Sequence, residues 1–145
     1  MSRSGLGRPI VHYEIPANDI EKLKKFYSDC FGWTFKDAKI PGMEYWLFTS
    51  AKNSPGGGMM KRMDPNHRPV NYVHVESIDT AVQTIQNAGG SIMLPKREIP
   101  GGQSFFIAIG LDPEGNPVGL FEAPRQPRKK TRSSRKATKK RKARR

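Results

Sequence analysis

The sequence predicts an α+β domain made of two similar units, each with a strand, a helix and three further strands, followed by a basic tail. Three observations support this prediction. A strand, a capped helix and a helix-ending glycine follow one another between Ile10 and Trp33, and the same pattern returns between Val70 and Gly90. All 13 acidic residues and 13 of the 26 Lys and Arg lie before Arg125, so the net charge of +13 belongs to residues 125–145.

The first unit begins with a strand over residues 10–15, because apolar residues alternate there with His12 and Glu14. Asn18 or Asp19 can cap the helix that follows, and Gly32 can end it in a left-handed conformation. The apolar stripe of this helix includes Cys30, which we expect to be buried as a small hydrophobic side chain. Three shorter strands are predicted at 33–36, 44–49 and 59–63, with a glycine-rich loop at 53–58.

The second unit repeats this order of elements. Residues 70–75 have the pattern of a strand, Ser77 or Asp79 can cap a helix, and Gly89-Gly90 can end that helix. Strands at 92–94, 104–109 and 118–122 follow, separated by turns rich in proline and glycine. One unit alone cannot bury its sheet, so we expect the two units to share a core.

This arrangement resembles the vicinal oxygen chelate superfamily, the relatives of glyoxalases, bleomycin-resistance proteins and extradiol dioxygenases. The resemblance covers Ile10 to about Ala123, and the motifs that carry it are His12 in the opening strand, Asp19, Phe26-Tyr27, Phe31-Gly32-Trp33, Ala88-Gly89-Gly90 and Asp112-Pro113-Glu114-Gly115-Asn116. It implies two βαβββ modules, about 8–63 and 70–123, within a domain of residues 1–124. Their strands would form a curved, incompletely closed mixed sheet around a cavity, with the helices outside.

In metal-dependent members of this superfamily, ligands come from a histidine in the first strand of each module and a carboxylate on the last strand. His12 matches the first position. The other positions fall near Val70 or Asn71, on Gly119, and in the first module's last strand on Gly58, Met59 or Met60. His74 and Glu122 could replace them, although a regular strand would turn Glu122 away from the face of Gly119. We therefore expect no metal of the family type and no other cofactor, with a rebuilt divalent-metal site as the alternative.

Strand alternation predicts which side chains line the cavity. If Val11, Tyr13 and Ile15 pack beneath the helices, then the residues between them point inward. The predicted cavity residues are His12, Glu14, Trp46, Met60, Tyr72, His74, Phe106 and Phe121. An aromatic pocket with a few polar groups suits a small, partly apolar ligand.

Two functions from different classes are compatible with these residues. The first is binding of a small molecule without a metal, in which His12 and Glu14 are hydrogen-bonded polar groups. The second is an enzyme: a glyoxalase-like lyase or isomerase, or a dioxygenase relative, that uses a non-standard metal site or a His12/Glu14 acid–base pair. The fold alone does not choose between them.

The tail, residues 125–145, contains no acidic and no large apolar residue, so we expect it to be disordered. It also lacks aromatic side chains that could stack on bases. What it can do is neutralise phosphates, which favours nonspecific binding of polyanions such as DNA, RNA or ribosomes. A tail that only improves solubility is the alternative, and an anionic membrane surface is a third possibility.

The sequence has a single cysteine, so it can form no intrachain disulfide, and neither a signal peptide nor a membrane span can be drawn. We therefore expect a cytoplasmic protein that does not act at a membrane. The resemblance implies that the protein forms a homodimer.

Overall fold

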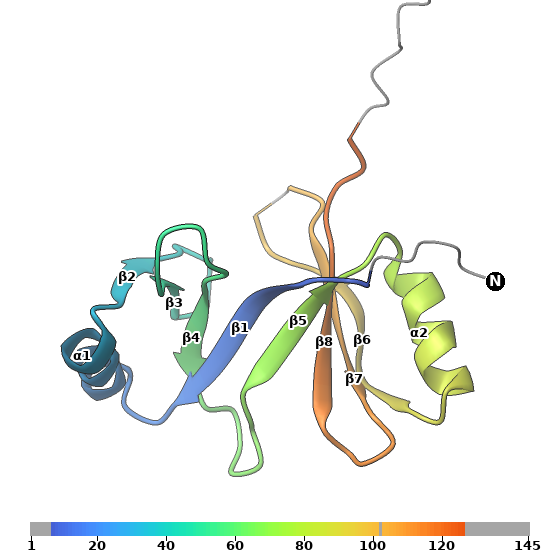
Figure 1. Cartoon of the computed structure of the whole chain (residues 1–145), viewed down its shortest axis with the longest axis horizontal. Coiled ribbons are helices and arrows are strands. Elements are labelled where there is room, and N and C mark those ends of the chain that lie inside the picture. The colour runs from blue at the N-terminus through green and yellow to red at the C-terminus, as the bar shows by residue number, and fades with distance from the viewer. Residues whose placement is uncertain (1–6, 102, 127–145) are drawn as a thin grey trace, which may run out of the picture.

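The computed structural model describes residues 7–101 and 103–126 and shows one eight-stranded sheet with two helices packed against it (Figure 1). The first unit contains β1 (Ile10–Ala17), α1 (Ile20–Phe31), β2 (Thr34–Asp37), β3 (Tyr45–Thr49) and β4 (Gly57–Lys61). The second contains β5 (Val70–His74), α2 (Ile78–Asn87), β6 (Ser91–Glu98), β7 (Phe106–Leu111) and β8 (Pro117–Glu122). The α+β class and the repeated order of elements are confirmed.

The strand order β2-β3-β4-β1-β5-β8-β7-β6 places the two units side by side. Within each unit the first and last strands run parallel, as β1 with β4 and β5 with β8, whereas β1 and β5 join the units as an antiparallel pair. The edge strands β2 and β6 belong to different units and do not pair with each other. The sheet is therefore mixed and incompletely closed.

Both helices begin at a side-chain cap. Asp19 accepts a hydrogen bond from the Lys22 backbone N–H at 3.0 Å, and Ser77 accepts one from the Thr80 backbone N–H at 3.2 Å. Gly32 ends α1 with a φ of 69°, the left-handed conformation that glycine adopts at little cost. Of the alternative caps in the sequence, the structure selects Asp19 and Ser77.

The apolar residues form two clusters on the helix side of the sheet, one for each unit. In the first, Ala17 of β1 and Met59 of β4 are buried together with Ile20, the first residue of α1. In the second, Ile78, Ala108 and Leu120 are buried where α2 begins. The units share one sheet, but the single shared core expected from the sequence is divided in two.

Other expectations need correction. Cys30 is exposed, because the apolar stripe of α1 is wider than the surface that the sheet covers. The glycine-rich run begins β4 at Gly57 instead of forming a loop throughout, and β6 extends from Ser91 through Pro95 to Glu98. The predicted disordered tail lies outside the described residues except for Arg125 and Gln126.

Candidate ligand-binding site

Cross-strand partners in a sheet point to the same face, so the strand registers show which side chains turn away from the helices. We call that side the inner face. Met59 is buried beneath α1 and pairs with Ile15, so His12 and Glu14, at alternate positions of β1, lie on the inner face. Leu120 belongs to the cluster near α2 and pairs with Val73, so Tyr72 and His74 also lie on the inner face.

A hydrogen-bonded network of four inner-face side chains lies where β1 and β5 meet. The Tyr45 hydroxyl donates to Glu14 Oε2 at 3.0 Å and lies 2.7 Å from His12 Nε2. The Tyr72 hydroxyl donates to Glu14 Oε1 at 3.3 Å. Since Tyr45 has one hydroxyl proton and gives it to Glu14, His12 completes the chain by donating its Nε2–H to the Tyr45 oxygen. His12 and Glu14 are thus connected through Tyr45 and not directly.

Burial controls the ionisation of this network, which we call the His12–Tyr45–Glu14–Tyr72 network. Glu14 is 8% exposed, and its burial raises the pKa of the carboxyl group, although the hydrogen bonds from Tyr45 and Tyr72 oppose this effect. Burial also lowers the pKa of His12. Burial, with the Glu14 charge as a further cause, raises the pKa values of both tyrosines far above their ordinary range. The arrangement keeps His12 neutral and both hydroxyls protonated.

The two glycines for which the resemblance would predict ligands, Gly58 and Gly119, lie against tyrosine rings. Glu14 pairs with Gly58 and Tyr72 pairs with Gly119, which are equivalent positions on the last strands of the two units. A Cβ at Gly58 would overlap the Tyr45 hydroxyl, and a Cβ at Gly119 would lie 2.5 Å from Tyr72 Cδ1. The tyrosine rings therefore occupy the space that a carboxylate side chain at either glycine would need. Within residues 7–101 and 103–126, no three His, Cys, Asp or Glu side chains gather as a metal-binding group.

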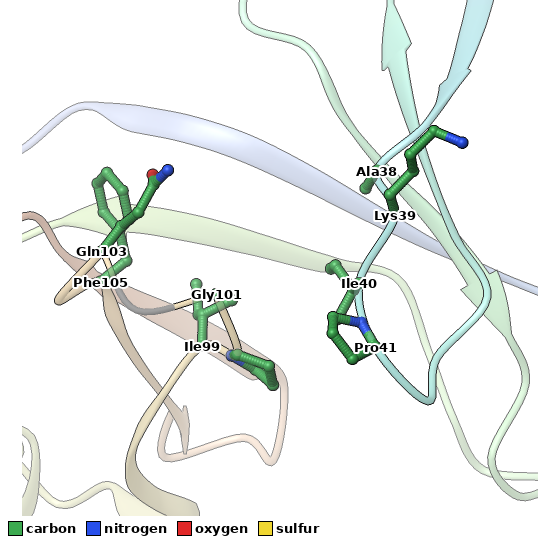
Figure 2. Close-up of a pocket in the computed structure, with 9 residues that line it drawn as sticks. Ala38, Lys39, Ile40, Pro41, Ile99, Gly101, Gln103 and Phe105 are labelled. Atoms are coloured by element: carbon green, nitrogen blue, oxygen red, sulfur yellow. The ribbon is translucent and has the colours of Figure 1, made fainter.

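A cavity of about 240 Å³ lies between two loops that face each other across the inner face (Figure 2). One loop follows β2 and contributes Ala38 to Pro41, and the other joins β6 to β7 and contributes Ile99 to Gly101, Gln103 and Phe105. The Ala38 N–H donates a hydrogen bond to the Tyr45 carbonyl at 2.9 Å, which extends the pairing of β2 with β3 by one residue. Phe105 stacks on Phe121 with ring centroids 5.5 Å apart. The cavity is therefore lined mainly by apolar side chains and lies next to the residues that hold Tyr45 and Phe121.

The structure places six of the eight predicted cavity residues on the inner face. His12, Glu14 and Tyr72 belong to the network, Met60 pairs with Tyr45, and the His74 and Phe121 rings lie 5.9 Å apart. The inward placement of Trp46 and Phe106 is wrong, because Trp46 packs on the cluster beneath α1 and Phe106 on the cluster near α2. Their chain neighbours Tyr45 and Phe105 occupy the inner face instead.

Tyr45 and Phe105 were missed because the sequence does not fix the phase of their strands. Two aromatic residues are adjacent near the start of each of these strands, Tyr45-Trp46 and Phe105-Phe106, and either member of a pair could face inward. The available signal was the alternation within β3, where Tyr45 and Phe48 are buried on opposite faces. Alternation separates the two faces of β3, but only the residues of the paired strand β4 show which of these faces is the inner one.

Comparisons with known proteins agree with this fold. The sequence profile described as Glyoxalase/Bleomycin resistance protein/Dioxygenase superfamily matches residues 9–120. A protein of Mycobacterium bovis named "Putative glyoxylase CFP32" is 29% identical over 119 residues, which are 77% of this chain and 44% of that protein. A glyoxylase-like domain-containing protein of Didymella fabae is 31% identical over 83 residues, 53% of this chain and 65% of that protein. The chain thus spans less than half the length of the mycobacterial relative.

Solved structures show the same architecture at low sequence identity. Methylmalonyl-CoA epimerase from Mycobacterium tuberculosis superposes with a TM-score of 0.60 at 15% identity, covering 86% of this chain and 93% of that chain. A superfamily member from Vibrio splendidus 12B01 gives 0.59 at 14% identity, covering 77% and 96%. No helix within the described residues is long and apolar enough to cross a membrane. With a family profile that covers most of the domain, the chain belongs to the glyoxalase, bleomycin resistance protein and dioxygenase superfamily.

Proposed function

We propose that this protein binds a small, partly apolar molecule on its inner face, through the entrance between the two loops, without a divalent metal. The observation that carries the proposal is that tyrosine rings cover both Gly58 and Gly119, where a carboxylate ligand would stand. The apolar entrance supports the choice of ligand, since Ile40, Ile99 and Phe105 line it. The network beneath offers polar groups that can orient the molecule.

The metal-free part of the proposal is tested by elemental analysis of the full chain after purification without chelators. We expect much less than one Zn, Ni, Mn or Fe per chain, for the wild type and for His12→Ala alike. A stoichiometric metal that is lost in His12→Ala would contradict the proposal and would favour a rebuilt metal site. The control is Gln83→Ala, because Gln83 is exposed on α2, on the other side of the sheet.

The binding part is tested with N-phenyl-1-naphthylamine, an uncharged fluorophore that brightens in apolar surroundings. We expect saturable binding that is unchanged by EDTA and weakened at least several-fold by Phe105→Ala, because the ring forms one wall of the entrance. Met63→Ala is the control, because its side chain is 76% exposed in the connector after β4. Equal effects of the two substitutions would place the fluorophore elsewhere.

An enzymatic function is the second candidate, and the network favours it. The buried carboxyl with a raised pKa is linked to His12 through Tyr45, a geometry in which a proton can pass between them. Two curated relatives carry glyoxylase in their names, so lyase or isomerase chemistry on small carbonyl compounds is the class to assay. Turnover that is abolished by Glu14→Gln but retained by Met60→Leu would support this candidate.

The basic tail is proposed to bind polyanions nonspecifically. The supporting fact is that residues 125–145 carry 13 Lys and Arg and no acid, against a neutral remainder. We expect deletion of 125–145 to abolish duplex DNA binding that is strong at 50 mM salt and weak at 200 mM. DNA affinity that survives the deletion would exclude the tail as the binding element.

A homodimer is also proposed, from family membership and from the aromatic side chains that α1 leaves exposed. Phe26 is 52% and Phe31 is 62% exposed on this helix. Light scattering during size-exclusion chromatography should give twice the mass of the 16.3 kDa chain. The monomer mass at micromolar concentration would reject the dimer. The cytoplasmic location stays a prediction.

A further inference from the structure

The inner face carries a positive charge that neither the fold nor the network uses. Arg97 on β6 pairs with Ile107, Ile107 pairs with Phe121, and Phe121 pairs with His74. These four residues therefore form one row across the inner face. Arg97 is exposed and takes part in none of the ion pairs that the described residues form.

Arg97 precedes the entrance by two residues in the chain, and its charge acts on the network. Ile99, two residues further along the chain, lines the entrance, and its N–H donates to the Phe105 carbonyl at 2.8 Å, which continues the β6–β7 ladder. Burial raises the pKa of Glu14, and the charge of Arg97 is one of the influences that oppose this rise. The charge of the guanidinium group therefore acts on Glu14 of the network.

No carboxylate on this face is available to Arg97. Among the described strand residues, Glu14 is the acidic side chain of the inner face, and both of its oxygens accept hydrogen bonds from tyrosine hydroxyls. Glu98 pairs with Phe106 and Glu122 accepts a hydrogen bond from the Ile78 N–H, which places both on the helix side. Arg97 is thus a cation of the inner face that has no ion-pair partner among the described residues.

Lys39 does not share this role. It lines the entrance from the opposite loop, but Figure 2 shows its ammonium group directed away from the facing loop. Its backbone has a φ of 52°, and its N–H donates to the Asp37 carboxylate at 2.8 Å, so the loop conformation is fixed locally. Arg97 is the cation that the register places on the face itself.

We propose that the molecule bound on the inner face is an organic anion, whose apolar part lies against Phe105 and Phe121 and whose carboxylate or phosphate group pairs with the Arg97 guanidinium. This inference rests on the proposed small-molecule binding and specifies the chemical class of the ligand. A guanidinium group offers parallel N–H donors that match two oxygens of such a group. The pairing is strengthened beside an apolar wall, where the effective dielectric constant is lower than in water.

The experiment compares two fluorophores of nearly the same shape: the uncharged N-phenyl-1-naphthylamine and the anionic 8-anilinonaphthalene-1-sulfonate. We expect the full chain to bind the anion more tightly, and Arg97→Gln to weaken anion binding about tenfold without changing binding of the uncharged compound. Lys22→Gln is the matched control, since it removes one positive charge from the exposed side of α1. All variants retain residues 125–145, so any contribution of the tail cancels in the comparison.

Displacement of the uncharged fluorophore then identifies the anionic group. Benzoate, phenyl phosphate and uncharged benzyl alcohol serve as competitors, and either anion should displace the fluorophore at a concentration about tenfold lower than the alcohol. Equal potency of all three, or equal effects of Arg97→Gln and Lys22→Gln on anion binding, would overturn the inference while leaving small-molecule binding intact. Failure of the wild type to bind the uncharged fluorophore would instead reject the proposed binding site.

Discussion

Removal of the Tyr45 hydroxyl is the most direct test of the network. In Tyr45→Phe the ring still covers Gly58, but the hydroxyl that bridges His12 Nε2 and Glu14 Oε2 is lost. Each buried polar group left without a partner costs about 1–3 kcal/mol. Glu14 keeps its bond from Tyr72, so we expect a total loss of about 2–4 kcal/mol in the free energy of unfolding.

This loss is measurable by two methods. Urea unfolding should show a lower midpoint with an unchanged slope, and calorimetry should show a melting temperature lower by roughly 8–16 °C, at about 4 °C per kcal/mol for a domain of this size. Tyr13→Phe is the matched control, because Tyr13 is 37% exposed on the helix side and its hydroxyl makes no hydrogen bond to the described residues. If Tyr45→Phe is as stable as Tyr13→Phe within about 0.5 kcal/mol, the network does not stabilise the fold as we argue.

Two further predictions concern the same face. Burial raises the pKa of Glu14 above its usual 4.5, so its contribution to stability is complete below that pH and is lost as pH rises through the folded-state pKa. Urea unfolding between pH 4 and 7 should therefore show Glu14→Gln becoming more stable relative to the wild type as pH rises; a pH-independent difference would contradict the raised pKa. Gly119→Ala should lower the free energy of unfolding by about 1–3 kcal/mol, since the new methyl group overlaps the buried ring 2.5 Å away. Gly7→Ala has open space around it and should be neutral, so equal melting temperatures of the two variants would count against a filled inner face.

Much of the fold could be predicted from local patterns. The strand over 10–15 and the helix that ends at Gly32 were predicted because alternation, capping and a left-handed glycine are properties of a few adjacent residues. The repeat of that pattern from Val70 predicted the second unit and, through the resemblance, the mixed open sheet. The sequence also shows glycine at 58 and 119, where the resemblance expects ligands, but the lack of a family-type metal stays a prediction.

The sequence could not predict which side chains meet across strands. A bulge between Leu94 and Arg97 reverses the alternation of β6, so Lys96 lies over the Phe106 ring on the helix side while Arg97 faces inward. In the same way, adjacent aromatic residues left the phase of β3 open, and Trp46 was predicted where Tyr45 lies. Both outcomes depend on the pairing register.

The sequence by itself determined the elements, their repetition and the residue types at the family's ligand positions, because those are set by spacing along one chain. Only the tertiary structure decided that His12 and Glu14 are joined through Tyr45, that tyrosine rings cover the two glycines, and that Arg97 lies on the inner face. The hydrogen bonds of the network join residues 31 to 58 positions apart. These outcomes depend on strand register and on a bulge, which arise when the whole sheet packs and leave no local signal in the sequence.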